Sequence, residues 1–115
     1  MQLTTHNTKS GLVIRVDEAR IDAAVAIEFK EAVRNAARCG DDPVILDLSQ
    51  VTFLDSSGLG AVVAVMKLLA PARALELAAL TPAVTRVFRL TRMDSVFTIH
   101  PTAPGKAAAS LKAAG

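Results

Sequence analysis

The stretch VILDLSQVTFLDSSGLGAVVAVMK, residues 44–67, decides the fold of this chain. Its first half is a short apolar run rich in β-branched residues, which predicts a buried central strand over Pro43–Ser49. Between its halves, LDSSGLG (residues 54–60) places an acid, two hydroxyls and two glycines in a strand-to-helix turn. Its second half predicts a helix that ends before Pro71. The residues expected to share one face of this helix are Leu59, Val62, Val63, Met66 and Ala70.

Upstream of this stretch the sequence predicts a hairpin and a helix. The segment TTHNTKSG, residues 4–11, predicts a short edge strand and a turn, and the alternating apolar residues from 12 to 16 predict a half-buried strand. From Asp22 onward the apolar period becomes helical. Asp22 is the expected N-cap of this helix, and Gly40 is its expected stop.

Downstream of the stretch, strand and helix alternate once more. The segment ALELAAL, residues 74–80, predicts a strand, and Thr81 followed by Pro82 predicts a helix start. The segment SVFTIH, residues 95–100, predicts the last strand. The alanine-rich tail, residues 101–115, has high helix propensity and predicts a loosely packed final helix.

The order of these elements predicts an α/β fold. We expect a four- to five-stranded mixed sheet with three to four helices packed mainly on one face. With 115 residues, the chain fits a single domain spanning 1–115, with a core over about residues 8–100. A hydrophobic content of 51% argues against intrinsic disorder.

Several segment types are not expected in this sequence. The longest apolar run, Leu59 to Met66, has eight residues, whereas a membrane-spanning helix needs about 20. The N-terminal residues contain no apolar core of a signal peptide. A single cysteine, Cys39, can form neither an intramolecular disulfide nor a structural metal site. The expected location is therefore the cytoplasm.

The charge balance does not indicate nucleic-acid binding. The chain has 13 basic and 11 acidic residues, a net charge of +2, and no Trp or Tyr on which bases could stack. Arg86, Arg89 and Arg92 recur at every third position. They predict a solvated helix face, and the alternative is a contact strip for an acidic partner.

The turn at residues 54–60 has a setting suited to an anion. In open α/β sheets, functional groups gather where the carboxyl end of a strand turns into a helix. The amide groups and the positive dipole end of a helix N-terminus stabilise negative charge there. Either Ser56 or Ser57 can cap the helix. A phosphate on the same serine would still find those amide donors, but it would change the charge of the surrounding surface.

These residues resemble a known family. The segment ILDLSQVTFLDSSGLGAVVAVMK is similar to the phosphorylatable segment of the STAS-domain anti-sigma-factor antagonists, which have a strand, an Asp-Ser-Ser/Thr-Gly turn and a helix in this order. The segment ARIDAAVAIEFKEAV resembles their acidic turn and first helix. The segment LELAALTPAVTRVFRLTRMDSVFTIH resembles their last strand–helix–strand unit.

The resemblance implies a binding switch with no catalysis of its own and no cofactor. Unphosphorylated family members bind an anti-sigma factor that is also a serine kinase, and the sigma factor is then released. The kinase phosphorylates the serine after the aspartate, here Ser56, which separates the complex, and a serine phosphatase reverses the modification. The mapped partner-binding residues are Asp22, Asp55, Ser56, Ser57, Gly58 and Leu59.

Two features leave other functions open. The family commonly has glycine where this chain has Ala19, and glycine in the loop that KLLAPARALEL occupies here. A STAS subunit of a transporter or signalling scaffold, without the switch, is the alternative. A serine hydrolase is disfavoured because LDSSG lacks the first glycine of the Gly-x-Ser-x-Gly elbow. The sequence does not specify an oligomeric state.

Overall fold

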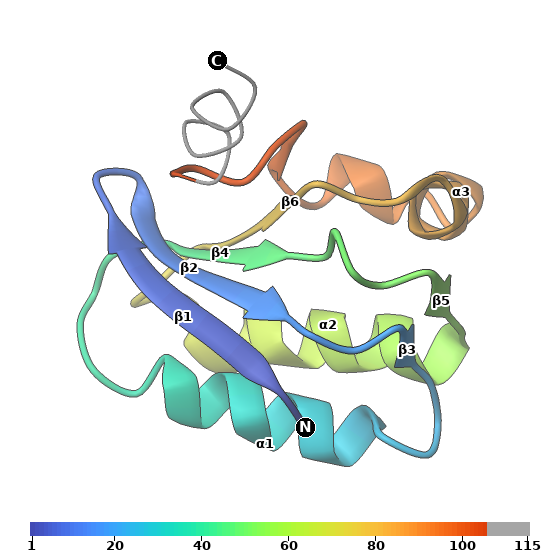
Figure 1. Ribbon diagram of the computed structural model, residues 1–115, viewed down its shortest axis with the longest axis horizontal. Coiled ribbons are helices and arrows are strands. Elements are labelled where there is room, and N and C mark those ends of the chain that lie inside the picture. The colour runs from blue at the N-terminus through green and yellow to red at the C-terminus, as the bar shows by residue number, and fades with distance from the viewer. Residues whose placement is uncertain (106–115) are drawn as a thin grey trace.

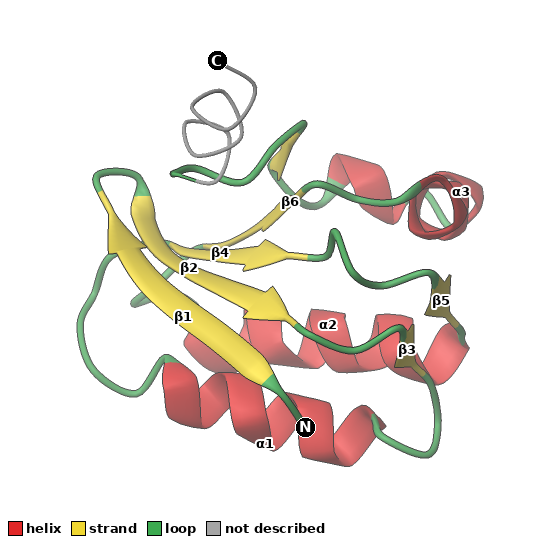
Figure 2. Ribbon diagram, in the orientation of Figure 1, coloured by secondary structure: helices red, strands yellow, loops and turns green. Residues whose placement is uncertain are grey.

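The predicted central strand lies in the middle of a five-stranded sheet, with the order β1-β2-β4-β6-β7. The computed structural model describes residues 1–105. β1 and β2 pair antiparallel, and the other neighbouring strands pair parallel. The sheet is therefore mixed, as predicted (Figures 1 and 2). Its strands are β1 (Leu3–Thr8), β2 (Gly11–Val16), β4 (Val44–Asp47), β6 (Leu75–Ala78) and β7 (Ile99–His100).

Helices α1 (Ala26–Ala36) and α2 (Ser56–Leu69) lie side by side across one face of this sheet (Figure 1). Helix α3 (Pro82–Leu90) packs beyond the strand ends, against β5 (Phe53–Leu54). β5 and β3 (Arg20–Ile21) form a separate two-stranded parallel sheet, which the sequence did not predict. The predicted α/β class and mixed sheet are confirmed.

The core fills the space between the sheet and the two helices. Alternate strand residues, among them Ile14, Leu46 and Leu77, are fully buried and belong to one cluster with Phe29 and Val62 of the helices. Burial of one such side chain contributes about 1.5–3 kcal/mol before the entropy cost of ordering is subtracted. This cluster fixes α2, and with it the turn from which α2 begins.

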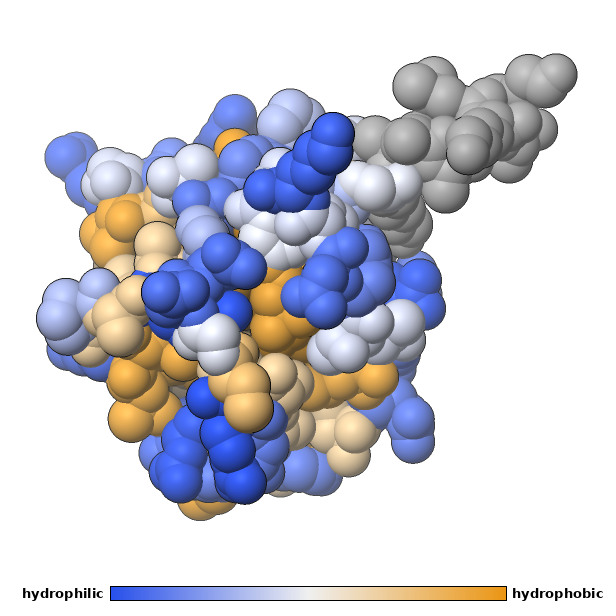
Figure 3. Space-filling model, turned by 90° about the vertical axis from the view of Figure 1, so that its left-hand side faces the viewer, coloured by the Kyte–Doolittle hydropathy of each residue, from blue (hydrophilic) through white to orange (hydrophobic). Residues whose placement is uncertain are grey.

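On the opposite face of the sheet, Ala103 of the segment 101–105 packs against the strands. Val13, Ile45 and Ala78 form a second small cluster with Ala103, which is 1% exposed. The predicted final helix extends into residues 106–115, which lie outside the described residues. Among residues 1–105, no helix is long and apolar enough to cross a membrane. Figure 3, seen from the side of the β1–β2 hairpin turn, shows hydrophilic and apolar residues interspersed over that face.

The predicted start and stop of the first helix are wrong. The helix begins at Ala26, four residues after Asp22, and Val25 occupies the N-cap position. Asp22 instead forms a preceding turn: its carboxylate accepts a hydrogen bond from Ala24 N, and its carbonyl accepts one from Val25 N. The helix ends at Ala36, before Gly40 is reached.

The predicted last strand is mostly irregular. A 3₁₀ turn, η1 (Met93–Ser95), occupies its start, and only Ile99–His100 pairs with β6. Between them Phe97 is buried, and its ring meets that of Phe88 edge to face at 5.9 Å. Burial of Phe97 against α3 outweighs continued strand pairing there.

A buried arginine after the end of α2 links two loops. Arg73 is 6% exposed, and its guanidinium donates hydrogen bonds to the carbonyl oxygens of Ala37, Cys39 and Asp42 at 2.7, 2.9 and 2.6 Å. These carbonyls belong to the chain between α1 and β4. One side chain therefore joins the loop after α2 to the loop after α1.

Candidate functional site

The predicted site is the turn between β5 and α2. β5 pairs in parallel with β3, in a register that sets Arg20 opposite Phe53 and Ile21 opposite Leu54. Each strand is followed directly by an aspartate, Asp22 after β3 and Asp55 after β5. The small sheet thus brings the turn before α1 next to the turn before α2, although the two are more than thirty residues apart.

Asp55 caps α2. Its backbone is extended, and its Oδ1 accepts a hydrogen bond from Gly58 N at 2.8 Å. Its Oδ2 accepts a second hydrogen bond, from Ala23 N at 3.2 Å. An aspartate N-cap of this kind stabilises a helix by about 1 kcal/mol. Here the same carboxylate also joins the turn before α1 to the first turn of α2.

Asp22 is linked through Arg20 to Phe53 of β5. Its Oδ2 is 3.2 Å from Nε of Arg20, an exposed ion pair. The Arg20 guanidinium also lies over the ring of Phe53, 4.1 Å from the ring centroid. Phe53 is 39% exposed despite this contact. Arg20 and Phe53 are therefore part of the site surface, and the sequence did not single them out.

Gly58 allows α2 to approach β3 closely. A Cβ at this position would lie 2.1 Å from the carbonyl oxygen of Ile21 and 2.7 Å from Cδ1 of Leu54. At Gly60, two residues further along α2, an added Cβ would meet nothing within 4 Å. Only the first of these glycines is required by packing.

Ser56 and Ser57 are both exposed, and neither hydroxyl makes a hydrogen bond within the described residues. The expectation that one of these serines caps α2 is wrong, because Asp55 accepts the hydrogen bond from the first turn. Ser57 borders a shallow hollow of about 200 Å³ between α1 and α2. Leu59 is half-buried and packs against the core.

Ala19, at the position where the family commonly has glycine, fits its place without backbone strain. Its φ is not positive, and its carbonyl accepts hydrogen bonds from the amides of Thr52 and Phe53 at 2.8 and 3.1 Å. The methyl group of Ala19 therefore leaves the approach of β3 to β5 intact.

Comparison with known proteins agrees with this architecture. The model of the STAS domain family matches residues 2–104. The chain belongs to the STAS domain family. Its match includes every strand and α-helix found in residues 1–105, so the family covers the whole region in which the Ser56 turn is built.

Solved STAS structures share the fold. An anti-sigma factor antagonist from Mycobacterium paratuberculosis is 27% identical with a TM-score of 0.76, over 94% of this chain and 92% of that chain. The anti-sigma factor antagonist SpoIIAA in its unphosphorylated form is 20% identical, with a TM-score of 0.67 over 97% of each chain. The murine Solute Carrier 26 family member A9 anion transporter is 16% identical, with a TM-score of 0.70 over 80% of this chain and 16% of the transporter.

Proposed function

We propose that this STAS protein is an anti-sigma-factor antagonist without catalytic activity, switched by phosphorylation of Ser56. In this proposal the unphosphorylated protein binds an anti-sigma factor with serine-kinase activity in the cytoplasm and so releases a sigma factor. The observation that carries the proposal is the exposed Ser56 hydroxyl, which makes no hydrogen bond to any residue in the described range 1–105.

The division of roles at the turn supports a switch. Because Asp55 supplies the cap, a phosphate could be added to Ser56 without removing a bond that holds α2. The N-terminus of α2 provides amide groups and a positive dipole end, which tolerate the new charge. The added charge, about −1.5 to −2 at pH 7, would lie beside the carboxylates of Asp22 and Asp55 and the exposed Phe53. A partner that packs on this surface would then face strong like-charge repulsion or an unpaired buried charge.

The test uses the cognate anti-sigma factor, ATP and the purified chain, with the modified residue located by mass spectrometry. We expect one phosphate on Ser56 and none on a Ser56→Ala variant. Phosphorylation should be unchanged in the matched control Ser57→Ala, which removes the adjacent serine that is also exposed. Ser56→Asp is expected to lose the anti-sigma factor in a pull-down, and a serine phosphatase is expected to restore binding of the phosphorylated protein. Normal partner binding by Ser56→Asp, together with no modification of Ser56, would rule out the switch.

The alternative is a STAS subunit that assembles with a transporter or scaffold without switching. The fold does not separate the two, since a STAS-like region also occurs within the murine anion transporter. The experiment does: stable association with a membrane or scaffold protein, indifferent to Ser56→Asp, would favour the alternative.

A further inference from the structure

Helix α3 and the residues directly after it carry three arginines without an ion pair among the described residues. Arg86, Arg89 and Arg92 are exposed, and within residues 1–105 no ion pair includes any of them. The inner side of the same helix is fixed by Val84 and Phe88, which are fully buried. The buried residues of α3 fix its orientation, and Arg86 and Arg89 therefore lie on its solvent-exposed side. Arg92 follows two residues after the helix ends.

An apolar residue lies among these charges. Leu90 is 78% exposed, the highest value among the exposed large apolar side chains of the described chain. Exposing a leucine beside unpaired arginines contributes nothing to folding. A surface that combines an exposed leucine with arginines is, however, suited to binding an apolar side chain flanked by acidic groups.

A groove runs beside these residues. One hollow of about 450 Å³ is lined by Leu80, Pro82, Thr85, Arg86, Arg89 and Leu90. A second hollow, of about 270 Å³, shares three of these residues and continues toward η1 and β7, where its polar lining includes Asp94 and His100 as well as Arg89. The part between Arg86 and Leu90 thus combines an apolar floor with two arginines and no acidic residue.

The backbone conformation of Arg92 is a second observation that favours a binding role for these arginines. Arg92 follows the C-cap of α3 with φ of +60° and ψ of 19°, the left-handed conformation that glycine adopts most easily after a helix. A non-glycine residue pays about 1–2 kcal/mol in that conformation. Glycine at this position would therefore make the protein more stable than arginine does. In the described part of the chain, no ion pair of the Arg92 guanidinium offsets this cost.

We propose that the groove beside α3 binds an acidic amphipathic helix of a protein partner. Carboxylates of that helix would pair with Arg86, Arg89 and Arg92, and an apolar residue would pack beside Leu90. A protein segment fits better than nucleic acid, because the groove floor is aliphatic and offers no exposed aromatic ring for stacking. This surface goes beyond the proposed switch, since it includes neither Ser56 nor the residues that hold its turn.

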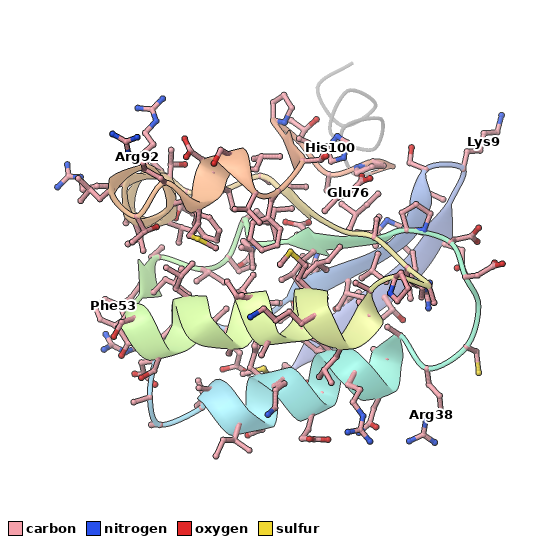
Figure 4. The ribbon with its side chains drawn as sticks, turned by 180° about the vertical axis from the view of Figure 1, so that it is seen from behind. Lys9, Arg38, Phe53, Glu76, Arg92 and His100 are labelled. Carbon is pink, nitrogen blue, oxygen red and sulfur yellow. The ribbon has the colours of Figure 1, made fainter. Side chains whose placement is uncertain are left out.

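The groove lies at the same end of the molecule as the Ser56 turn. α3 packs on β5, which ends one residue before Asp55, and the Thr81 hydroxyl donates a hydrogen bond to the Val51 carbonyl at 2.6 Å. Figure 4 shows Arg92 and Phe53 at one end and Arg38 at the other. A partner could therefore occupy both surfaces, although each can be tested alone.

The test titrates the isotope-labelled chain with a synthetic peptide that carries glutamates and leucines on one helical face. We expect NMR shift changes concentrated at Leu80, Thr85, Arg86, Arg89 and Leu90, and an affinity that falls as salt is added. The double variant R86Q/R89Q should weaken binding about three- to tenfold, as loss of two exposed ion pairs predicts. Leu90→Ser should weaken it at unchanged salt dependence.

Two further variants separate binding from folding and from net charge. Arg92→Gly should weaken peptide binding while leaving the protein equally or more stable, because glycine relieves the positive φ. The control R38Q/K67Q removes the same charge from exposed positions away from α3 and should bind the peptide normally. Equal weakening by this control, shifts spread over the whole surface, or tighter binding of a single-stranded oligonucleotide or anionic phospholipid vesicles would overturn the proposal. These measurements involve no kinase, so their failure would leave the Ser56 switch untouched.

Discussion

Substituting alanine at the two glycines of α2 should have opposite effects on stability. In Gly60→Ala the new methyl group meets nothing within 4 Å, and alanine is favoured over glycine in a helix interior by about 0.5–1 kcal/mol. In Gly58→Ala the methyl carbon would lie 2.1 Å from the Ile21 carbonyl oxygen. Ordinary contact requires about 3.4 Å, so α2 or β3 must shift by more than an ångström.

The magnitude of the Gly58→Ala effect follows from what must move. The clashing atom is backbone of a paired strand, so relief requires an adjustment of the kind that costs about 1–3 kcal/mol in overpacked cores. Since a carbonyl cannot rotate away as a side chain can, we take the upper part of that range, about 2–3 kcal/mol. Gain in helix propensity offsets about 1 kcal/mol. The expected net loss is about 1–2 kcal/mol, which places the two variants about 1.5–3 kcal/mol apart.

The assay is urea denaturation followed by far-UV circular dichroism, because the chain contains no Trp or Tyr for intrinsic fluorescence. Equal slopes in urea would show that the midpoints report stability. In thermal unfolding the two variants should differ by roughly 6–12 °C, at about 4 °C per kcal/mol for a domain of this size. Wild-type stability in Gly58→Ala, or a loss in Gly60→Ala as large as that in Gly58→Ala, would refute the packing argument.

Three further substitutions test other contacts. Asp55→Ala removes the cap and the link to Ala23, and a loss of about 1–2 kcal/mol is expected in urea denaturation; an unchanged midpoint would contradict the capping role. Arg73→Met leaves three loop carbonyls without their donor, so a loss of about 2–3 kcal/mol is expected, with faster hydrogen exchange at the loop between α1 and β4; exchange accelerated only elsewhere would show that the arginine does not hold this loop. Phe88→Ala opens a cavity under α3, with an expected loss of about 3–5 kcal/mol by calorimetry; a loss below about 1 kcal/mol would mean that α3 repacks freely.

The longer strands and helices were predictable because their apolar periods are local, whereas the two-residue strands β3 and β5 were not predicted. Val44, Ile45 and Leu46 form a continuous apolar run because both faces of β4 are buried: Val44 and Leu46 belong to the core under α1 and α2, and Ile45 belongs to the cluster with Ala103 on the other face. The inner face of α2 was predicted less well. Its buried residues include Gly58 and Ala61 together with Val62 and Val65. Small residues lie where the helix approaches closest, whereas hydropathy alone favours larger ones such as Met66.

The site was predictable only in part, for a physical reason. The acid–serine–serine–glycine turn is contiguous in sequence, so its place at a strand end followed from local pattern. Arg20 and Phe53 become neighbours only through the pairing of β3 with β5, two-residue strands with too little sequence for a detectable period. Asp22 was misassigned as a helix cap because its turn closes before α1 begins, and no local signal separates the two.

The two hydrogen bonds accepted by Asp55 bear on the entropy of association. One carboxylate fixes the turn before α1 relative to the first turn of α2, and Gly58 holds the same two segments in van der Waals contact. The surface that contains Asp22 and Ser56 is thus already in one arrangement before anything binds. A partner gains its contacts there without ordering a loop, and ordering such side chains and loops is a main cost that weakens other interfaces of equal area. Modest contact area on this side of the molecule can therefore support a specific complex.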